Sequence, residues 1–185
     1  MNTAAKTALV VAAIGSESLE TVTIVNVLRR AGVVVTLASL EGSAAVASTR
    51  DIGLVADASF AQAAAIDYDL IALPGGETGA MALSAHAPLI EKLRAQRLAH
   101  RWIGALCAAP AIVLGRHGLL DGKQATGYPS FRDELLHYVE LPVVTDGHTI
   151  TGQGPASAIA FALSLVEALM GGQVRQRVAS DLLTV

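Results

Sequence analysis

The sequence predicts an α/β fold with a mostly parallel sheet and helices on both of its faces. Short apolar runs rich in Val, Ile and Leu alternate with longer segments of helical periodicity, which is the pattern of strands joined by crossover helices. Hydrophobic residues make up 52% of the 185 residues and aromatic residues only 4%, so small aliphatic side chains must form the core. No repeat, low-complexity stretch or Pro/Ser-rich linker is present, and we expect residues 1–185 to form one domain.

The elements follow in order from these runs. Strands are predicted at residues 8–14, 33–38, 70–73, 102–106 and 143–145. Helices are predicted at residues 17–31, 88–100 and 155–170, with a helical segment at 108–115 and short β-like pieces within residues 44–55. The first helix has apolar residues at helical spacing and Gly32 as a C-terminal cap. Because functional sites of such folds lie at the carboxyl ends of the strands, the residues to consider are Gly15, Gly75, Gly76 and Cys107.

Composition excludes several classes of site. The chain has 13 basic and 16 acidic residues, and its one basic cluster, around residues 92–101, is spaced as a solvated helix face, so no nucleic-acid partner is expected. A single cysteine excludes a disulfide framework, a Cys-rich zinc site and an iron–sulfur cluster within one chain. The five histidines lack metal-ligand spacing, and the usual dinucleotide and nucleotide motifs are missing. We therefore expect no metal and no cofactor.

The N-terminus allows two interpretations. Lys6 ahead of the apolar run at residues 8–14 imitates a signal peptide, but a buried first strand is preferred because a helix follows directly after Gly15. The long uncharged stretches are interrupted by Gly, Pro, Ser, Thr or Gln, so no membrane segment is expected. A lone cysteine with no disulfide partner in its chain is typical of a cytoplasmic protein, which is the location we expect.

Cys107 lies between a predicted strand and a helical segment, among the small residues Gly104, Ala108 and Ala109. This arrangement resembles a nucleophile elbow, in which a strained strand-to-helix turn presents the nucleophile. A thiol in the first turn of a helix is also expected to favour the thiolate. A lone cysteine is otherwise often a small buried hydrophobe, and its position at the strand end makes us prefer a reactive role.

Two acidic residues and two glycines are candidates to act with this thiol. Glu17 and Glu20 follow the first strand, where acidic residues also have the ordinary role of stabilising a helix N-terminus. If the strands carrying Glu20 and Cys107 lie close in the sheet, the carboxyl is expected to retain its proton and donate a hydrogen bond to the thiolate. Gly75 and Gly76 follow the strand at residues 70–73 and offer backbone N–H groups for an oxyanion.

Six short motifs in order resemble the ThiJ/PfpI superfamily, and within it the subgroup of the parkinsonism-associated protein deglycase and its bacterial YajL-like relatives. They are GSESLETV at residues 15–22, RRAG at 29–32, TRD at 49–51, LPGG at 73–76, ALCAAP at 105–110 and QGP at 153–155. The resemblance covers nearly the whole chain. It implies a flavodoxin-like, class I glutamine amidotransferase-like three-layer sandwich and a homodimer.

The resemblance also implies roles for individual residues. Cys107 and Glu20 would be catalytic and share a proton, and Gly75, Gly76 and Ala108 would be backbone donors. The surrounding substrate pocket would include Glu17, Arg50, Tyr128 and Pro155. The dimer contact would include Arg29 and Arg30. Two positions depart from relatives: Ala108 replaces the His that follows the cysteine in protease-like members, and Tyr128 replaces a His found before Pro129 in the parkinsonism-associated branch.

These residues, together with the resemblance, lead to a hypothesis of a cofactor-free cysteine enzyme acting on small reactive aldehydes or dicarbonyls. It would be a glutathione-independent glyoxalase that converts methylglyoxal to lactate, a deglycase acting on glycated proteins, or both, with Cys107 as nucleophile and Glu20 transferring protons. The competing hypothesis is a redox sensor or chaperone linked to oxidative stress, in which Cys107 is oxidised. A peptidase or amidase is disfavoured because Ala108 removes the triad histidine. A member with the fold and negligible activity stays a third alternative.

Overall fold

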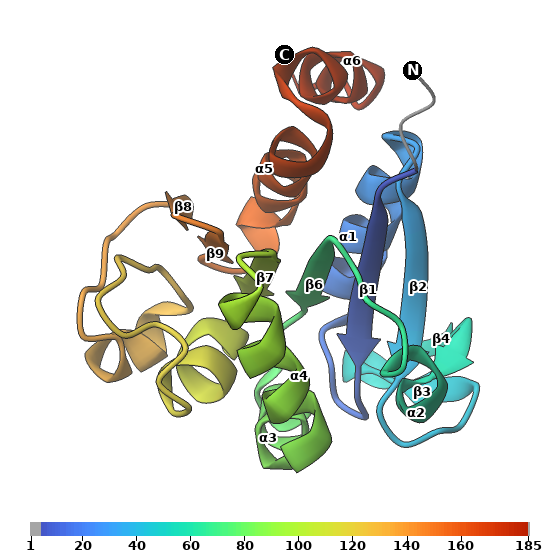
Figure 1. Ribbon diagram of the computed structural model, residues 1–185, viewed down its shortest axis with the longest axis vertical. Helices are drawn as coiled ribbons and strands as arrows, with labels where there is room; N and C mark the ends of the chain where they lie inside the picture. Colours follow the sequence, from blue (N-terminus) through green and yellow to red (C-terminus); the bar gives the residue numbers. More distant parts are fainter. Residues whose placement is uncertain (1–4, 185) are drawn as a thin grey trace.

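A computed structural model describes residues 5–184 and contains a seven-stranded sheet in the order β5-β2-β1-β6-β7-β9-β8 (Figure 1). Its strands are β1 (Thr7–Ala12), β2 (Val34–Ser39), β5 (Ala58–Ser59), β6 (Leu70–Leu73), β7 (Trp102–Leu106), β8 (Val143–Asp146) and β9 (Thr149–Gly152). All neighbouring pairs are parallel except β8 with β9, so the antiparallel strand lies at one edge. The predicted α/β fold with a mostly parallel sheet is confirmed.

Helices cover both faces of this sheet. They are α1 (Ser18–Arg30), α2 (Phe60–Ala63), α3 (Glu77–Ala85), α4 (Ala87–Leu98), α5 (Ala158–Met170) and α6 (Gly172–Asp181). The chain moves from β1 to β2 in one direction along the sheet and from β6 to β7 in the other. Right-handed crossovers therefore place α1 and α4 on opposite faces. α1 packs against α5 on its face, and α4 packs against β7 (Figure 1).

Several predicted elements need correction. The helix expected from Pro155 begins with a 3₁₀ turn, Pro155–Ser157, and α5 starts at Ala158. The helical segment after Cys107 is a π-helix, Pro110–Gly115. β5, α2, α3, β9 and α6 were not predicted from the sequence. β9 is fully buried between β7 and β8, so its position comes from its neighbours rather than from a long apolar run.

The β-like pieces expected within residues 44–55 form a separate hairpin. β3 (Ala45–Ala47) pairs antiparallel with β4 (Gly53–Val55), and a 3₁₀ turn, Thr49–Asp51, connects them. Gly15 N–H donates to Ala47 O at 2.8 Å, and Thr49 N–H donates to Ser16 O at 3.0 Å. These bonds fix the hairpin beside the loop that leads into α1.

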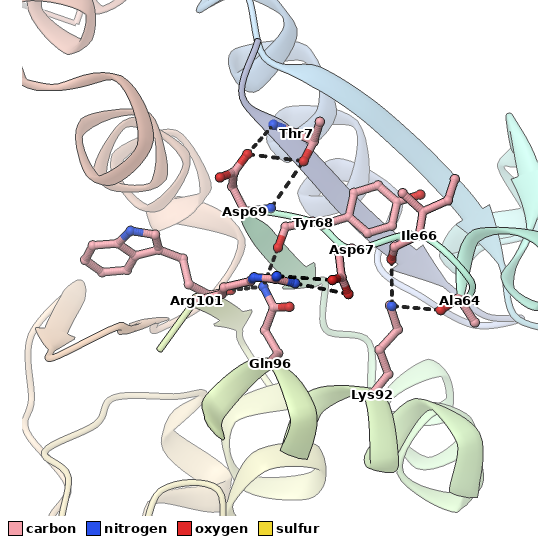
Figure 2. Close-up of polar contacts among 10 residues, drawn as sticks. Thr7, Ala64, Ile66, Asp67, Tyr68, Asp69, Lys92, Gln96 and Arg101 are labelled. Carbon is pink, nitrogen blue, oxygen red and sulfur yellow. Dashed lines mark hydrogen bonds and ion pairs between the residues drawn. The ribbon is translucent and has the colours of Figure 1, made fainter. Parts of the chain in front are cut away.

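The amino ends of the central strands are joined by side chains that bond to backbone groups (Figure 2). Asp69, just before β6, accepts the Thr7 N–H of β1 at 2.9 Å. Gln96 of α4 donates to Tyr68 O at 3.0 Å and to Trp102 O at 3.1 Å, which ties α4 to β6 and β7. Gln96 thus satisfies one carbonyl just before β6 and one at the start of β7. This end of the sheet is thus occupied by structural bonds, while the carboxyl ends remain for the site.

The central strands are apolar throughout because helices cover them on both sides. Residues 8–12 and 70–73 are completely buried. Gly104 of β7 lets Phe161 and Leu165 of α5 approach the sheet, since a Cβ at Gly104 would lie 2.9 Å from Leu165 Cδ2. Among residues 5–184, no helix has both the length and the apolar composition needed to cross a bilayer.

Candidate active site

Cys107 follows β7 directly and has a left-handed backbone, with φ of 63°. Its N–H donates to Gly152 O at 2.9 Å and its carbonyl accepts the Tyr128 N–H at 2.7 Å. A non-glycine residue in this region of φ/ψ space is strained, and such strain is concentrated at functional sites. The sharp turn expected at the end of the strand is therefore present, and two flanking segments hold it.

Glu20 lies in the first turn of α1 and is completely buried. Its Oε2 accepts the Gly75 N–H at 2.7 Å, and the carboxyl is a neighbour of Cys107, since a Cβ on Gly75 would lie 2.9 Å from Glu20 Oε2 and 2.5 Å from Cys107 Cβ. β1 and β7 are separated by β6, so the two residues meet because Gly75, at the carboxyl end of β6, lies between them. The predicted proximity of Glu20 and Cys107 is thus reached across β6.

Burial is the main cause that raises the pKa of Glu20 to about 7, opposed by the Gly75 N–H and the Cys107 thiol. Glu20 Oε1 is buried and has no hydrogen-bond partner among the described residues. A protonated carboxyl would place its O–H at this oxygen without leaving a buried charge. The expectation that Glu20 retains its proton more readily than in water agrees with this environment.

Burial, and next the negative charge of Glu20, raise the pKa of the Cys107 thiol to about 12. Cys107 lies in a turn before the π-helix rather than in the first turn of a helix, and the N–H groups of Gly76 and Ala108 lower its pKa by less than burial and Glu20 raise it, so this environment favours the thiol over the expected thiolate. The thiol and the carboxyl form a coupled pair. When the pair carries one negative charge, it holds a single proton between sulfur and oxygen.

The three proposed backbone donors are not equivalent. The Gly75 N–H is used by Glu20, whereas the N–H groups of Gly76 and Ala108 act on the Cys107 sulfur. Gly75 must lack a side chain, since a Cβ there would lie 2.5 Å from Cys107 Cβ and 2.9 Å from Leu106 O. The structure therefore leaves Gly76 and Ala108 as the donors beside the reacting atom.

Glu17 caps α1 and connects it to the β3–β4 hairpin. Its Oε1 accepts the Leu19 N–H at 3.3 Å and its Oε2 accepts the Thr49 hydroxyl at 2.9 Å. Arg50 follows Thr49 in the hairpin turn with φ of 59°, and its exposed side chain forms no ion pair with any other described residue. The structure brings Glu17 close enough to Glu20 to influence its pKa and leaves Arg50 exposed in the hairpin turn.

Tyr128 and Pro155 line one pocket of about 400 Å³, and the Tyr128 N–H is bonded to the Cys107 carbonyl. Arg29 and Arg30 lie apart from the site, in a groove of about 540 Å³ along α1. Arg29 pairs with Asp57 at 2.6 Å, and Arg30 donates to Asn26 Oδ1 at 2.8 Å. Among residues 5–184, no three His, Cys, Asp or Glu side chains are grouped as metal ligands would be.

Sequence reasoning missed two residues that support the site. Gly152 accepts the Cys107 N–H, and Thr49 holds Glu17 through its hydroxyl. Gly152 ends a Thr-Ile-Thr-Gly run, which is a possible signal of a strand end, and Thr49 belongs to the TRD motif at residues 49–51 but was given no role of its own.

The chain matches a family of known proteins. Residues 6–168 match the DJ-1/PfpI family. Protein dj-1beta of Drosophila melanogaster is 42% identical over 182 residues, which cover 96% of this chain and 97% of that protein. The Parkinson disease protein 7 homolog of Danio rerio is 39% identical over 186 residues, 97% and 98% of the two chains. The glutathione-independent glyoxalase DJ-1 of Schizosaccharomyces pombe is 33% identical over 130 residues, 64% and 66% of the two.

Solved structures show the same architecture. The crystal structure of Drosophila melanogaster DJ-1beta has a TM-score of 0.94 at 42% identity and covers 97% of this chain and 98% of that one. Oxidized Toxoplasma gondii DJ-1 has a TM-score of 0.95 at 38% identity, with the same coverage of 97% and 98%. The flavodoxin-like sandwich and the resemblance noted from the motifs are confirmed, and the chain belongs to the DJ-1/PfpI family.

Proposed function

We propose that this protein is a cofactor-independent glyoxalase that converts methylglyoxal to lactate without glutathione. The observation that carries the proposal is the buried Glu20–Cys107 pair, with a strained nucleophile and two N–H groups beside its sulfur. The relative from Schizosaccharomyces pombe named a glutathione-independent glyoxalase supports the same reaction class. Deglycation of proteins would use the same thiol on early glycation adducts, with the protein amine as leaving group.

The reaction begins with the singly ionised pair. Glu20 takes the thiol proton as Cys107 sulfur attacks the aldehyde carbon, and the N–H groups of Gly76 and Ala108 stabilise the oxyanion. Protonation of that oxygen by Glu20 gives a hemithioacetal. Glu20 then removes the C1 hydrogen as a proton and an enediol forms. Proton return at C2 gives the lactoyl thioester, which water hydrolyses to lactate and free thiol. The aldehyde carbon is oxidised while the ketone carbon is reduced, so no external oxidant or reductant is needed.

We expect purified protein to form lactate from methylglyoxal in the absence of glutathione, with kcat/KM that rises with pH. The Glu20–Cys107 pair must lose one proton to become active, and the Glu20 pKa of about 7 sets the pH at which this ionisation occurs. Below it, log kcat/KM should increase by one unit per pH unit, and above it the profile should level off. Lactate would be measured enzymatically at each pH. Absence of lactate, or a rate that does not change between pH 5.5 and 8.5, would contradict the proposal.

We also propose that the protein is a homodimer that uses the face formed by α1 and β4. Leu19 and Val22 of α1 and Val55 of β4 are 52%, 50% and 79% exposed. Val22 and Val55 both line the 540 Å³ groove, which also contains Arg29 and Arg30. An apolar surface shared by two neighbouring elements favours a second copy of the chain as its occupant.

Val22→Glu is expected to convert the dimer to a monomer, because it places a charge in the apolar centre of this face. Light scattering after size-exclusion chromatography would measure the mass. Leu98→Glu is the matched control, since Leu98 is 81% exposed on α4 and lies outside the groove. A wild-type protein that elutes as a monomer, or a dimer lost equally in both variants, would exclude this interface.

A further inference from the structure

A pocket of about 400 Å³ lies beside the Cys107 turn and is bounded by two segments of chain. One wall comes from Tyr128 and Pro129, and the other from Gly154, Pro155 and the first turn of α5 at Ala160. Its volume is within the range of small-molecule sites. The reactions of the Glu20–Cys107 pair with methylglyoxal do not require a pocket of this size.

Both walls are attached to the backbone of Cys107 itself. The Cys107 carbonyl accepts the Tyr128 N–H at 2.7 Å, and the Cys107 N–H donates to Gly152 O at 2.9 Å, two residues before Gly154. The Tyr128 ring faces Gly154, since a Cβ on Gly154 would lie 3.4 Å from Tyr128 Cδ2. The pocket is therefore held in a fixed position relative to the nucleophile.

The chemistry of the pocket favours an uncharged, apolar guest. Three of the six prolines of the chain line it, Pro129, Pro142 and Pro155. None of the described residues that line it carries a charge. Its polar side chains are limited to Tyr128, Gln153 and Ser157, and the Ser157 hydroxyl already accepts the Gly154 N–H and donates to Gly154 O. Prolines give rigid walls without N–H donors, and the half-exposed Tyr128 ring supplies an aromatic surface.

We infer that this pocket is a subsite for the apolar substituent of larger α-oxoaldehydes, so that an aryl glyoxal is a better substrate than methylglyoxal. The inference rests on the proposed glyoxalase function and specifies its substrate class. For phenylglyoxal, the thiol adds to the aldehyde, the C1 proton moves to C2 through the enediol, and water releases mandelate and free thiol. Carbon C1 is oxidised and C2 reduced within the substrate, as with methylglyoxal, while the phenyl ring would lie between Tyr128 and Pro155.

Ala160→Leu tests the subsite by filling it. Ala160 is exposed in the first turn of α5, and leucine is nearly as good a helix former as alanine, so the fold should tolerate the change. We expect kcat/KM for phenylglyoxal, relative to that for methylglyoxal, to fall about tenfold. The matched control is Ala95→Leu, an exposed alanine within α4 that does not line the pocket, and it should leave both values as in wild type.

A binding measurement separates the subsite from the proposed reaction. Acetophenone, an uncharged aryl ketone without an aldehyde, should shift the amide resonances of Gly154, Ala156 and Ser157 in wild type and in Ala95→Leu, but not in Ala160→Leu. If Ala160→Leu turns over both substrates and its ratio of kcat/KM for phenylglyoxal to kcat/KM for methylglyoxal equals that of wild type, the subsite is overturned and the glyoxalase proposal stands. Absence of turnover with these amide shifts present would overturn the glyoxalase function alone. Absence of the shifts in wild type would overturn the subsite.

Discussion

Replacing Cys107 by serine is expected to lower kcat/KM for methylglyoxal by about 10³-fold or more. The serine hydroxyl is a much weaker nucleophile than the thiol, and the Glu20 carboxyl is not basic enough to ionise it. The backbone bonds from Cys107 to Gly152 and Tyr128 do not involve the side chain, so the fold should be retained. Lactate formation by the two proteins at pH 8, with circular dichroism as the check on folding, measures the effect.

The opposite result would redirect the functional assignment. Equal rates in wild type and Cys107→Ser would show that the thiol is not the nucleophile. A wild-type protein without turnover, whose Cys107 becomes a sulfinate under mild peroxide by mass spectrometry, would instead favour the redox-sensing or chaperone alternative. Peroxide reacts with the thiolate, and burial and the charge of Glu20 raise the pKa of the Cys107 thiol, so we expect peroxide to react with the resting site more slowly than with a free cysteine.

Replacing Glu20 by glutamine is expected to remove turnover while making the protein more stable above neutral pH. The pKa of Glu20 rises from 4.5 to about 7 on folding. Between these values the folded chain holds a proton that the unfolded chain has released, so the free energy of unfolding falls as pH rises. Above pH 7 the ionised Glu20 lowers the free energy of unfolding by its full amount, about 3 kcal/mol, since each unit of pKa difference corresponds to about 1.36 kcal/mol. Glutamine cannot ionise, and its carbonyl can still accept the Gly75 N–H, so this cost is avoided.

Denaturant unfolding at pH 4.5 and pH 8 tests this prediction. The gain in free energy of unfolding for Glu20→Gln should be about 2 to 3 kcal/mol at pH 8 and close to zero at pH 4.5. Its kcat/KM should fall by about 10²- to 10⁴-fold because the group that moves protons is gone. Glu140→Gln is the matched control, since Glu140 is an exposed glutamate outside the site and should leave both quantities as in wild type. A variant as unstable at pH 8 as wild type would contradict a buried, ionisable Glu20.

The parts of the fold that sequence predicts well are those whose burial is complete. The runs at residues 70–73 and 102–106 match β6 and β7 residue for residue, because strands covered by helices on both faces are apolar at every position. α1 matches within one residue at each end, since its period, the Glu17 cap and Gly32 all agree. β9 and α6 have no such pattern. β9 is short and contains two threonines, and α6 buries only Val178 and Ala179, so neighbours determine both.

The sequence by itself determined the family and the α/β class and singled out Cys107 and Glu20 as candidate catalytic residues, because each inference depends on residue types at fixed positions along the chain. Only the tertiary structure decided how their groups interact. It directs the Gly75 N–H to Glu20, leaves Gly76 and Ala108 for the sulfur, and joins Tyr128 and Gly152 to the Cys107 backbone. It also decides where the proton resides, because the pKa of a carboxyl or thiol depends on burial and on neighbouring charges contributed by distant segments.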